Sequence, residues 1–254
     1  MRLFPLFTAA LLFARAAAGQ TPSSAHEPPP VWDAQVGASF VGTSGNSSTS
    51  SFGADFSAHD RGPVWQLEST ATAVRASSEG LRTAERYVGG FRAQRTLTPV
   101  LKLSAGEHAE RDRLAGIAFR NILDAGLGYA MVKRPEWTVD GTTSLAWNHE
   151  NWIAGPNRND PIAVLQVLSR VPFGAAGDTT QRFTFYPDLR EGSAYRSEAE
   201  VTAQAAMNAH LALKLGYLWR YSHAPVPGFL RTDNTATASV VLHWRSIETV
   251  PAAP

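Results

Sequence analysis

The segment "EHAERDR" holds the clearest candidates for acid–base chemistry in this chain. His108, Glu110 and Asp112 occupy alternate positions, so in an extended strand all three side chains point to the same face. A histidine beside two carboxylates could act as a general acid or base in hydrolysis. The same spacing also suits ion pairs with arginines of neighbouring strands, and we prefer this structural interpretation. The arginines expected there are Arg86, Arg92 and Arg120.

A second candidate lies in "AWNHENW", where His149 adjoins Asn148, Glu150 and Asn151. Membrane-barrel phospholipases carry a histidine and a serine two positions apart on one strand, with an asparagine nearby. Here Asn151 occupies the position of the serine, so the nucleophile is missing. We therefore expect His149 to lie at a strand end without a catalytic role.

The sequence contains no motif typical of a metal or phosphate-cofactor site. It has no cysteine, and its seven histidines form no His-x-His or His-x3-His pair, so ligand spacings typical of metal sites are missing. No glycine-rich phosphate loop follows a strand and opens a helix. The net charge of +1 provides no general attraction for nucleic acid. We expect no catalytic residue, no metal, no cofactor and no nucleic-acid partner.

The elements that position these residues show the period-2 alternation of β-strands. In "HLALKLGYLWRYS", Leu213, Leu215 and Tyr217 share one face, whereas Ala212 and Lys214 share the other. This alternation recurs along the whole chain after residue 30. The predicted strands span residues 31–43, 49–60, 64–76, 86–97, 100–111, 119–133, 137–149, 162–171, 180–187, 195–206, 209–222 and 232–244.

The connections between these strands alternate in length. Tight turns are expected at "DRGP", "TLTP", "KRPE" and "MNAH", and longer polar loops at "SSEGLRTAE", "RDRLAGIA", "NWIAGPNRND", "PDLREGSA" and "APVPGFLRT". Short turns on one side and longer loops on the other are typical of outer-membrane barrels. The sequence therefore predicts one all-β domain, a single antiparallel transmembrane β-barrel of about twelve strands over residues 31–244, with outer-membrane lipid around it.

The aromatic residues and the charges support this orientation of the strands. Barrels carry aromatic girdles at both membrane interfaces and a polar lumen. One girdle is expected to hold Trp32, Trp65, Trp137 and Trp244, and the other Phe40, Phe52, Tyr87, Trp147, Trp219 and Tyr221. We place a network of charges in the lumen, with Arg92 beside Lys102 and Glu110 and with Arg196 and Arg220 on the same polar face. The network residues are Arg86, Arg92, Lys102, His108, Glu110, Asp112 and Arg120.

The two ends of the chain indicate export to the envelope. Residues 1–19 have the basic start, the short apolar run and the small residues of a cleaved signal peptide. Residues 20–30 form a flexible lead-in rich in Pro and Ser. The last strand ends on Trp244 and resembles the terminal signal that the barrel-assembly machinery recognises, although a tail at 245–254 follows it.

Several segments together resemble a known family. "FVGTSGNSSTSSFGADF", "LRTAERYVGGFRAQRTLTPVLKLSAGEHAERDRLAG", "DAGLGYAMV" and "YLWRYSHAPVPGFLRTDNTATASVVL" follow the order of motifs in the salt-stress-induced outer-membrane proteins of domain of unknown function 481. The resemblance covers nearly the whole mature chain. It implies an outer-membrane barrel without a defined molecular activity, and it brings no catalytic residues.

We therefore expect a structural or envelope-stress protein, or a narrow channel for small solutes, in the outer membrane. Two alternatives stay open. One is a hydrolase at the barrel rim that uses His108 with Glu110 and Asp112, or His149. The other is a soluble secreted β-barrel that binds an apolar ligand inside.

Overall fold

The computed structural model describes residues 32–43, 49–174 and 177–245. The expected signal peptide, the lead-in and residues 246–254 of the tail lie outside the described residues. Twelve strands are present in the described part, together with a 3-10 helix at Arg113–Ala115. The strands are β1 (Trp32–Thr43), β2 (Thr49–Arg61), β3 (Trp65–Ser78), β4 (Leu81–Thr96), β5 (Leu101–Asp112), β6 (Ile117–Arg134), β7 (Trp137–Trp152), β8 (Arg158–Phe173), β9 (Gly177–Pro187), β10 (Tyr195–Ala206), β11 (Leu211–Ser222) and β12 (Thr232–Arg245).

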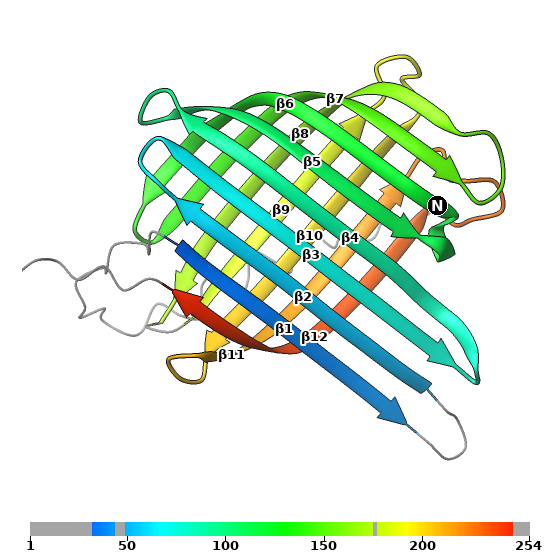
Figure 1. Cartoon of the computed structure of the whole chain (residues 1–254), viewed down its shortest axis with the longest axis horizontal. Coiled ribbons are helices and arrows are strands. Elements are labelled where there is room, and N and C mark those ends of the chain that lie inside the picture. Colours follow the sequence, from blue (N-terminus) through cyan, green and yellow to red (C-terminus); the bar gives the residue numbers. More distant parts are fainter. Residues whose placement is uncertain (1–31, 44–48, 175–176, 246–254) are drawn as a thin grey trace, which may run out of the picture.

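These strands form one closed barrel in chain order, and β12 returns to pair with β1 (Figure 1). All neighbours are antiparallel, so the predicted fold class and strand number are confirmed. The part of the chain that the structure describes contains no helix with the length and apolar composition of a membrane span.

The two faces of the wall differ as the alternation predicts. On β11, Leu213 and Leu215 are 45% and 52% exposed on the outside, whereas Ala212 is fully buried towards the lumen. On β1 and β2, Phe40, Phe52 and Phe56 all point outwards and are exposed. The outer surface at these positions is therefore apolar, whereas charged side chains of the same strands, such as Asp55 and Lys214, face the lumen. This polarity is opposite to that of a soluble barrel with an apolar interior.

We call the end where β1 begins and β12 ends the termini end, and the opposite end the loop end. Trp32, Trp65, Trp137 and Trp244 are exposed on the outside near the termini end. Towards the loop end Trp147 is exposed, and Trp219 stacks on Tyr221 with the ring centroids 6.1 Å apart. Whether these rows meet the two membrane interfaces stays a prediction.

One predicted loop is wrong. "SSEGLRTAE" was expected to be long and polar, but β3 continues to Ser78 and β4 already begins at Leu81. Only Glu79 and Gly80 connect them, with φ values of 51° and 76°. Two successive positive φ values are the mark of a type I′ hairpin turn, whose twist matches that of the flanking strands. The polar residues of this segment belong to a hairpin that extends beyond β5, whose pairing with β4 ends at Arg86, while β2 pairs with β3 up to Ser78.

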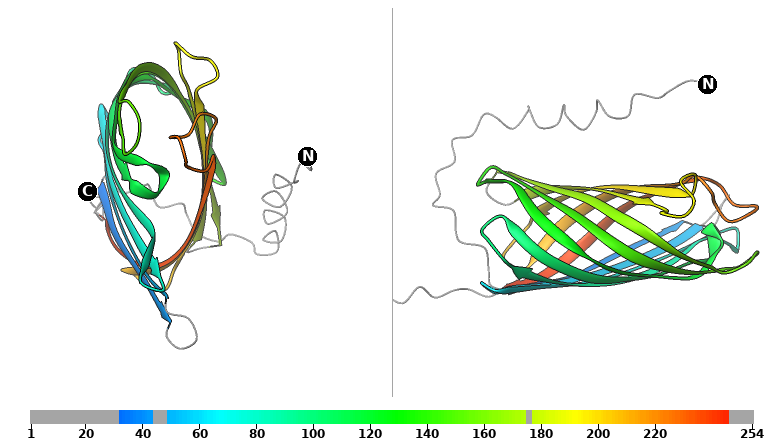
Figure 2. Two further views of the ribbon diagram at one scale, coloured as in Figure 1. Left: turned by 90° about the vertical axis from the view of Figure 1, so that its right-hand side faces the viewer. Right: turned by 90° about the horizontal axis from the view of Figure 1, so that it is seen from above.

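The other strand boundaries differ from the prediction by at most four residues, and the largest differences are at the end of β7, which is three residues later than predicted, and at the starts of β8 and β9. Strands β8 and β9 begin four and three residues earlier than the predicted starts at 162 and 180, at Arg158 and Gly177. The barrel is also flattened. The end view shows an elongated oval cross-section (Figure 2). Flattening brings side chains of opposite walls within reach of each other.

Candidate functional site: a charged cluster in the lumen

Glu110 lies at the centre of the lumen's charged groups. Its side chain on β5 is 1% exposed and receives hydrogen bonds from three arginines. Arg86 Nε of β4 donates to Oε1 at 2.8 Å, and Arg120 Nη1 of β6 donates to Oε2 at 2.7 Å. Arg220 Nη1 of β11 donates to Oε1 at 2.9 Å. β4 and β6 flank β5, but β11 belongs to another part of the wall, so this last bond spans the lumen.

Further pairs extend this arrangement in both directions. Arg220 Nη2 also binds Asp112 Oδ2 at 2.6 Å. On the other side, Glu150 of β7 accepts from Arg120 Nη2 at 2.7 Å and from Arg196 Nη1 of β10 at 3.4 Å. We call this set the lumen cluster. Its members are Arg86, Glu110, Asp112, Arg120, Glu150, Arg196 and Arg220.

The lumen cluster is held by alternation of opposite charges. A buried carboxylate is costly unless it is paired and hydrogen-bonded, and Glu110 has its charge matched by three guanidinium groups. Guanidinium forks also fix geometry, because each can donate to two acceptors at once. Arg120 does so between Glu110 and Glu150, and Arg220 between Glu110 and Asp112. The cluster therefore cross-links six strands, β4, β5, β6, β7, β10 and β11, through the interior.

An apolar cluster fills the lumen beside these charges. Ile122, Ala146, Ile162 and Val164 are buried there, and Tyr186 of β9 packs against them. The guanidinium carbon of Arg196 lies 5.2 Å from the centroid of the Tyr186 ring. Charged and apolar side chains together occupy the part of the lumen nearer the loop end.

Two connections fold over the same end of the barrel (Figure 2). Residues 223–231 follow β11, and the connection at 113–116 follows β5. Val226 is only 3% exposed. Gly116, with φ 81°, lies against Val226 and Phe229, and a Cβ on it would come within 2.8 Å of both side chains. A residue larger than glycine is therefore disfavoured there by backbone conformation and by space.

Hydrogen bonds between main-chain atoms hold these connections in place. Ile153 N donates to Gly116 O at 2.8 Å, and His223 N donates to Tyr195 O at 3.0 Å. The connection 223–231 is also closed on itself, because Ser222 N donates to Arg231 O at 2.8 Å. The loop end is thus covered by ordered chain above the lumen cluster.

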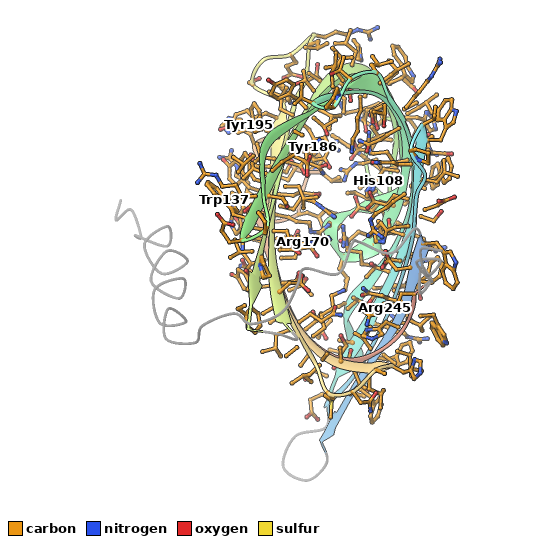
Figure 3. The ribbon with its side chains drawn as sticks, turned by 90° about the vertical axis from the view of Figure 1, so that its left-hand side faces the viewer. His108, Trp137, Arg170, Tyr186, Tyr195 and Arg245 are labelled. Carbon is orange, nitrogen blue, oxygen red and sulfur yellow. The ribbon has the colours of Figure 1, made fainter. Side chains whose placement is uncertain are left out.

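The lumen is wider towards the termini end. A cavity of about 580 Å³ lies there, and its lining carries both signs of charge. Asp33 pairs with His59 and Arg61, Lys214 Nζ lies 3.3 Å from Asp55, and Arg182 lies 3.4 Å from Glu200. Figure 3 looks into the barrel from the left of Figure 1, and Arg170 and His108 point into this space.

The structure brings some of the predicted lumen residues together and separates others. Arg86, Glu110, Asp112 and Arg120 belong to the lumen cluster. Lys102 does not, because its Nζ donates to Gln66 Oε1 at 2.7 Å. His108 faces the lumen but lies along the wall of the wider cavity.

The expected position of Arg92 is wrong. It lies opposite Gly106 on β5, not beside Lys102 and Glu110. The space left by Gly106 lets its guanidinium reach β6, where it binds Asp124 at 2.8 and 3.0 Å. It also donates to Ser104 Oγ at 2.8 Å. Arg92 therefore forms a separate pair further from the loop end.

Three members of the lumen cluster were not predicted to join it: Glu150, Arg196 and Arg220. Strand alternation places all three inside the barrel, and that signal is present in the sequence. The missing information is which strands face each other across the lumen, which depends on the barrel's flattened shape.

The geometry around the two candidate hydrolase sites is that of paired structural groups. Glu110 and Asp112 are both engaged by arginines. His149 faces outwards, and its Nδ1 lies 2.6 Å from Asn159 Oδ1. Within the described residues, no group of three or more His, Asp or Glu side chains is arranged to hold a metal ion.

Comparison with solved structures finds other barrels of low identity. A NanC porin structure aligns with a TM-score of 0.47 and 10% identity, covering 84% of this chain and 97% of that one. The COG4313 outer membrane channel from Pseudomonas putida F1 aligns with a TM-score of 0.46 and 12% identity, covering 88% of this chain and 98% of that one. The translocator domain of autotransporter NalP from Neisseria meningitidis aligns with a TM-score of 0.44 and 12% identity, covering 94% of this chain and 97% of that one.

No curated protein matches the chain. A family model described as "Protein of unknown function, DUF481" matches residues 36–244. The matched region runs from within β1 to the penultimate residue of β12, so it includes the whole lumen cluster. The predicted membership of the family of domain of unknown function 481 is thereby confirmed, and the chain belongs to the DUF481 family.

Proposed function

We propose that this protein spans the outer membrane as a barrel that is occluded near the loop end and conducts only small solutes. The observation that carries the proposal is the bond between Arg220 and Glu110 across the lumen, with two further arginines on the same carboxylate. An occluded end with a wider, charged chamber behind it suits a narrow pathway, not a general diffusion pore.

The outer wall supports the membrane location. Its exposed side chains include Phe40, Leu123, Leu145 and Leu215, which are 74%, 62%, 69% and 52% exposed. An apolar surface of this kind is unfavourable in water and favourable in lipid. Apart from part of the seam between β1 and β12, the barrel also pairs backbone groups between neighbouring strands, as a span through hydrocarbon requires. We expect lipid around the wall and the barrel-assembly machinery to act during biogenesis.

An envelope-stress role is compatible with this occlusion and forms part of the proposal. A barrel that passes little solute could serve the envelope mainly as a structural element. Growth of a deletion strain at high salt, with and without the restored gene, tests this role. Normal growth of the deletion strain under salt stress would count against it.

Conductance in planar bilayers tests the channel. The wild-type barrel should give small conductance steps, because the lumen cluster fills the narrow part. Arg220→Ala removes the bond across the lumen and should raise the conductance several-fold. Arg182→Ala, in the wide part, is the matched control and should change it little. Large steps from the wild-type protein, unchanged by Arg220→Ala, would contradict the proposal.

A further inference from the structure

The barrel wall is not paired along its full length at the seam between β1 and β12. β1 pairs with β2 from Trp32 to Thr43, but it pairs with β12 only from Asp33–Arg245 to Ala38–Val240. On β12, residues 232–239 pair with β11 and, among the described residues, with no strand on the other side. The two strands lie together at the termini end and diverge towards the loop end (Figure 1).

The side chains along this opening change from apolar to polar across the wall. Phe40 points outwards beside the opening, and so do Ala236 and Ala238 of β12. On the lumen side lie hydroxyl groups, including those of Ser39 and Thr237. The opening is therefore apolar where it meets the exterior and hydroxyl-lined where it meets the lumen.

A cavity of about 110 Å³ lies behind the opening. Its lining includes the lumen-facing pair Lys214 and Asp55, whose charged atoms are 3.3 Å apart. It also includes Tyr217, which belongs to the outer face of β11 and donates to Asn234 Oδ1 at 2.8 Å. Residues of both faces of the wall thus border one space.

An unpaired strand edge inside a membrane needs a partner. Backbone N–H and C=O groups left without hydrogen bonds in hydrocarbon cost several kcal/mol each. A purely apolar molecule cannot supply these hydrogen bonds, and a purely polar molecule does not partition into the bilayer from which the opening is reached. A molecule with a polar head and an apolar chain satisfies both sides of the opening.

We propose that the seam between β1 and β12 is a lateral opening through which a single-chain amphiphile places its polar head in the lumen while its chain stays in the bilayer. This inference rests on the proposed membrane location. The cavity of about 110 Å³ takes the head and not the chain, so it selects an amphiphile with a small head, such as a fatty-acid carboxylate, over phosphatidylcholine. The mixed charges of Lys214 and Asp55 allow the head to bind through either sign, in addition to the hydroxyl groups.

Engineered cysteines test whether the opening exists, and the chain contains no native cysteine to interfere. If the register of the paired part continued, Phe40 would face Ala238, just as Val36 faces Leu242. In the folded barrel, Val36→Cys with Leu242→Cys should form a disulfide readily. Phe40→Cys with Ala238→Cys should form little. Equal cross-linking of the two pairs would show a closed seam and overturn the inference.

A fluorescent label on Thr202→Cys reports on the lumen beside the opening. A fatty acid with bromine on the carbon next to its carboxylate should quench it, because the head brings the bromine into the lumen, whereas phosphatidylcholine with two brominated chains should not. Thr237→Trp, which fills the opening, should remove most of the quenching. Gln35→Trp, which faces the lumen in the paired part, should leave it unchanged. Absence of quenching by the fatty acid, or equal quenching by phosphatidylcholine, would overturn the inference.

A second label distinguishes a failure of this inference from a failure of the proposed membrane location. Leu215→Cys lies on the outer face and should be quenched by the chain-brominated phosphatidylcholine in every variant. If it is quenched and the Thr202→Cys label is not, the barrel spans the bilayer without a lateral opening. If this phosphatidylcholine does not quench the Leu215→Cys label, the membrane location itself fails.

Discussion

Arg220 and Glu110 are separated by 110 positions in the sequence, yet Arg220 Nη1 lies 2.9 Å from Glu110 Oε1. The bond joins β11 to β5 through the interior of the barrel. It exists because the barrel is flattened and because strand alternation turns both side chains inwards. Removal of either partner leaves buried charge without its counter-charge, and the first prediction concerns this cost.

Arg220→Ala should destabilise the folded barrel strongly. Removal of one partner from a buried ion pair costs about 3–5 kcal/mol, because the remaining charge stays buried. Arg182→Ala is the control, since Arg182 and Glu200 are each 38% exposed and exposed pairs contribute about 0–1 kcal/mol. Urea unfolding in lipid vesicles, followed by tryptophan fluorescence, measures both. Equal losses in the free energy of unfolding for the two variants would show that the lumen cluster stabilises the barrel no more than an exposed ion pair does.

Gly116→Ala should loosen the covering of the loop end. The left-handed φ and the contact with Phe229 and Val226 both oppose a Cβ, and strain of this kind costs about 1–3 kcal/mol. Gly192→Ala is the control, because a Cβ there meets nothing within 4 Å. Protease cleavage in the 223–231 connection should become faster in Gly116→Ala alone. Unchanged cleavage in both variants would contradict the packing described for this connection.

Charge should be tolerated on one face of the wall and not on the other. Leu215→Arg puts a cation into lipid and should cost about 2–4 kcal/mol near the bilayer midplane. Thr202→Arg is matched in depth, because Thr202 lies opposite Gly216, the residue next to Leu215. It faces the cavity and has Glu200 nearby, so its cost should be much smaller. A larger loss of stability for Thr202→Arg than for Leu215→Arg would show that the lipid face and the lumen face have been assigned the wrong way round.

His108→Ala and His149→Ala should leave the envelope phenotype unchanged. Glu110 and Asp112 are bound by arginines, and His149 faces outwards against Asn159. Within the described residues, neither histidine forms a hydrogen bond with a carboxylate that would orient it as a general base. Loss of a hydrolytic activity in purified, folded His108→Ala protein would establish the hydrolase alternative instead.

Strand alternation alone predicts much of this structure. It gives the twelve strands and their in–out pattern, because each side chain's face follows from its parity once one face is apolar. It does not give the two-residue hairpin turn at Glu79 and Gly80, since polar residues at the end of a hairpin resemble those of a loop. It also misplaces Arg92 and leaves Arg220 out of the network. Both errors concern register and contacts across the lumen, which a strand-by-strand pattern does not contain.

Accessibility of a cysteine in the chamber tests the occlusion most directly. Thr202→Cys lines the wide cavity, and the lumen cluster lies between it and the loop end. In vesicles of known orientation, a small membrane-impermeant thiol reagent added at the termini end should label this cysteine fast. The same reagent added at the loop end should label it slowly, and Arg220→Ala should abolish the difference. Equally fast labelling of the otherwise wild-type barrel from both ends would contradict an occluded lumen.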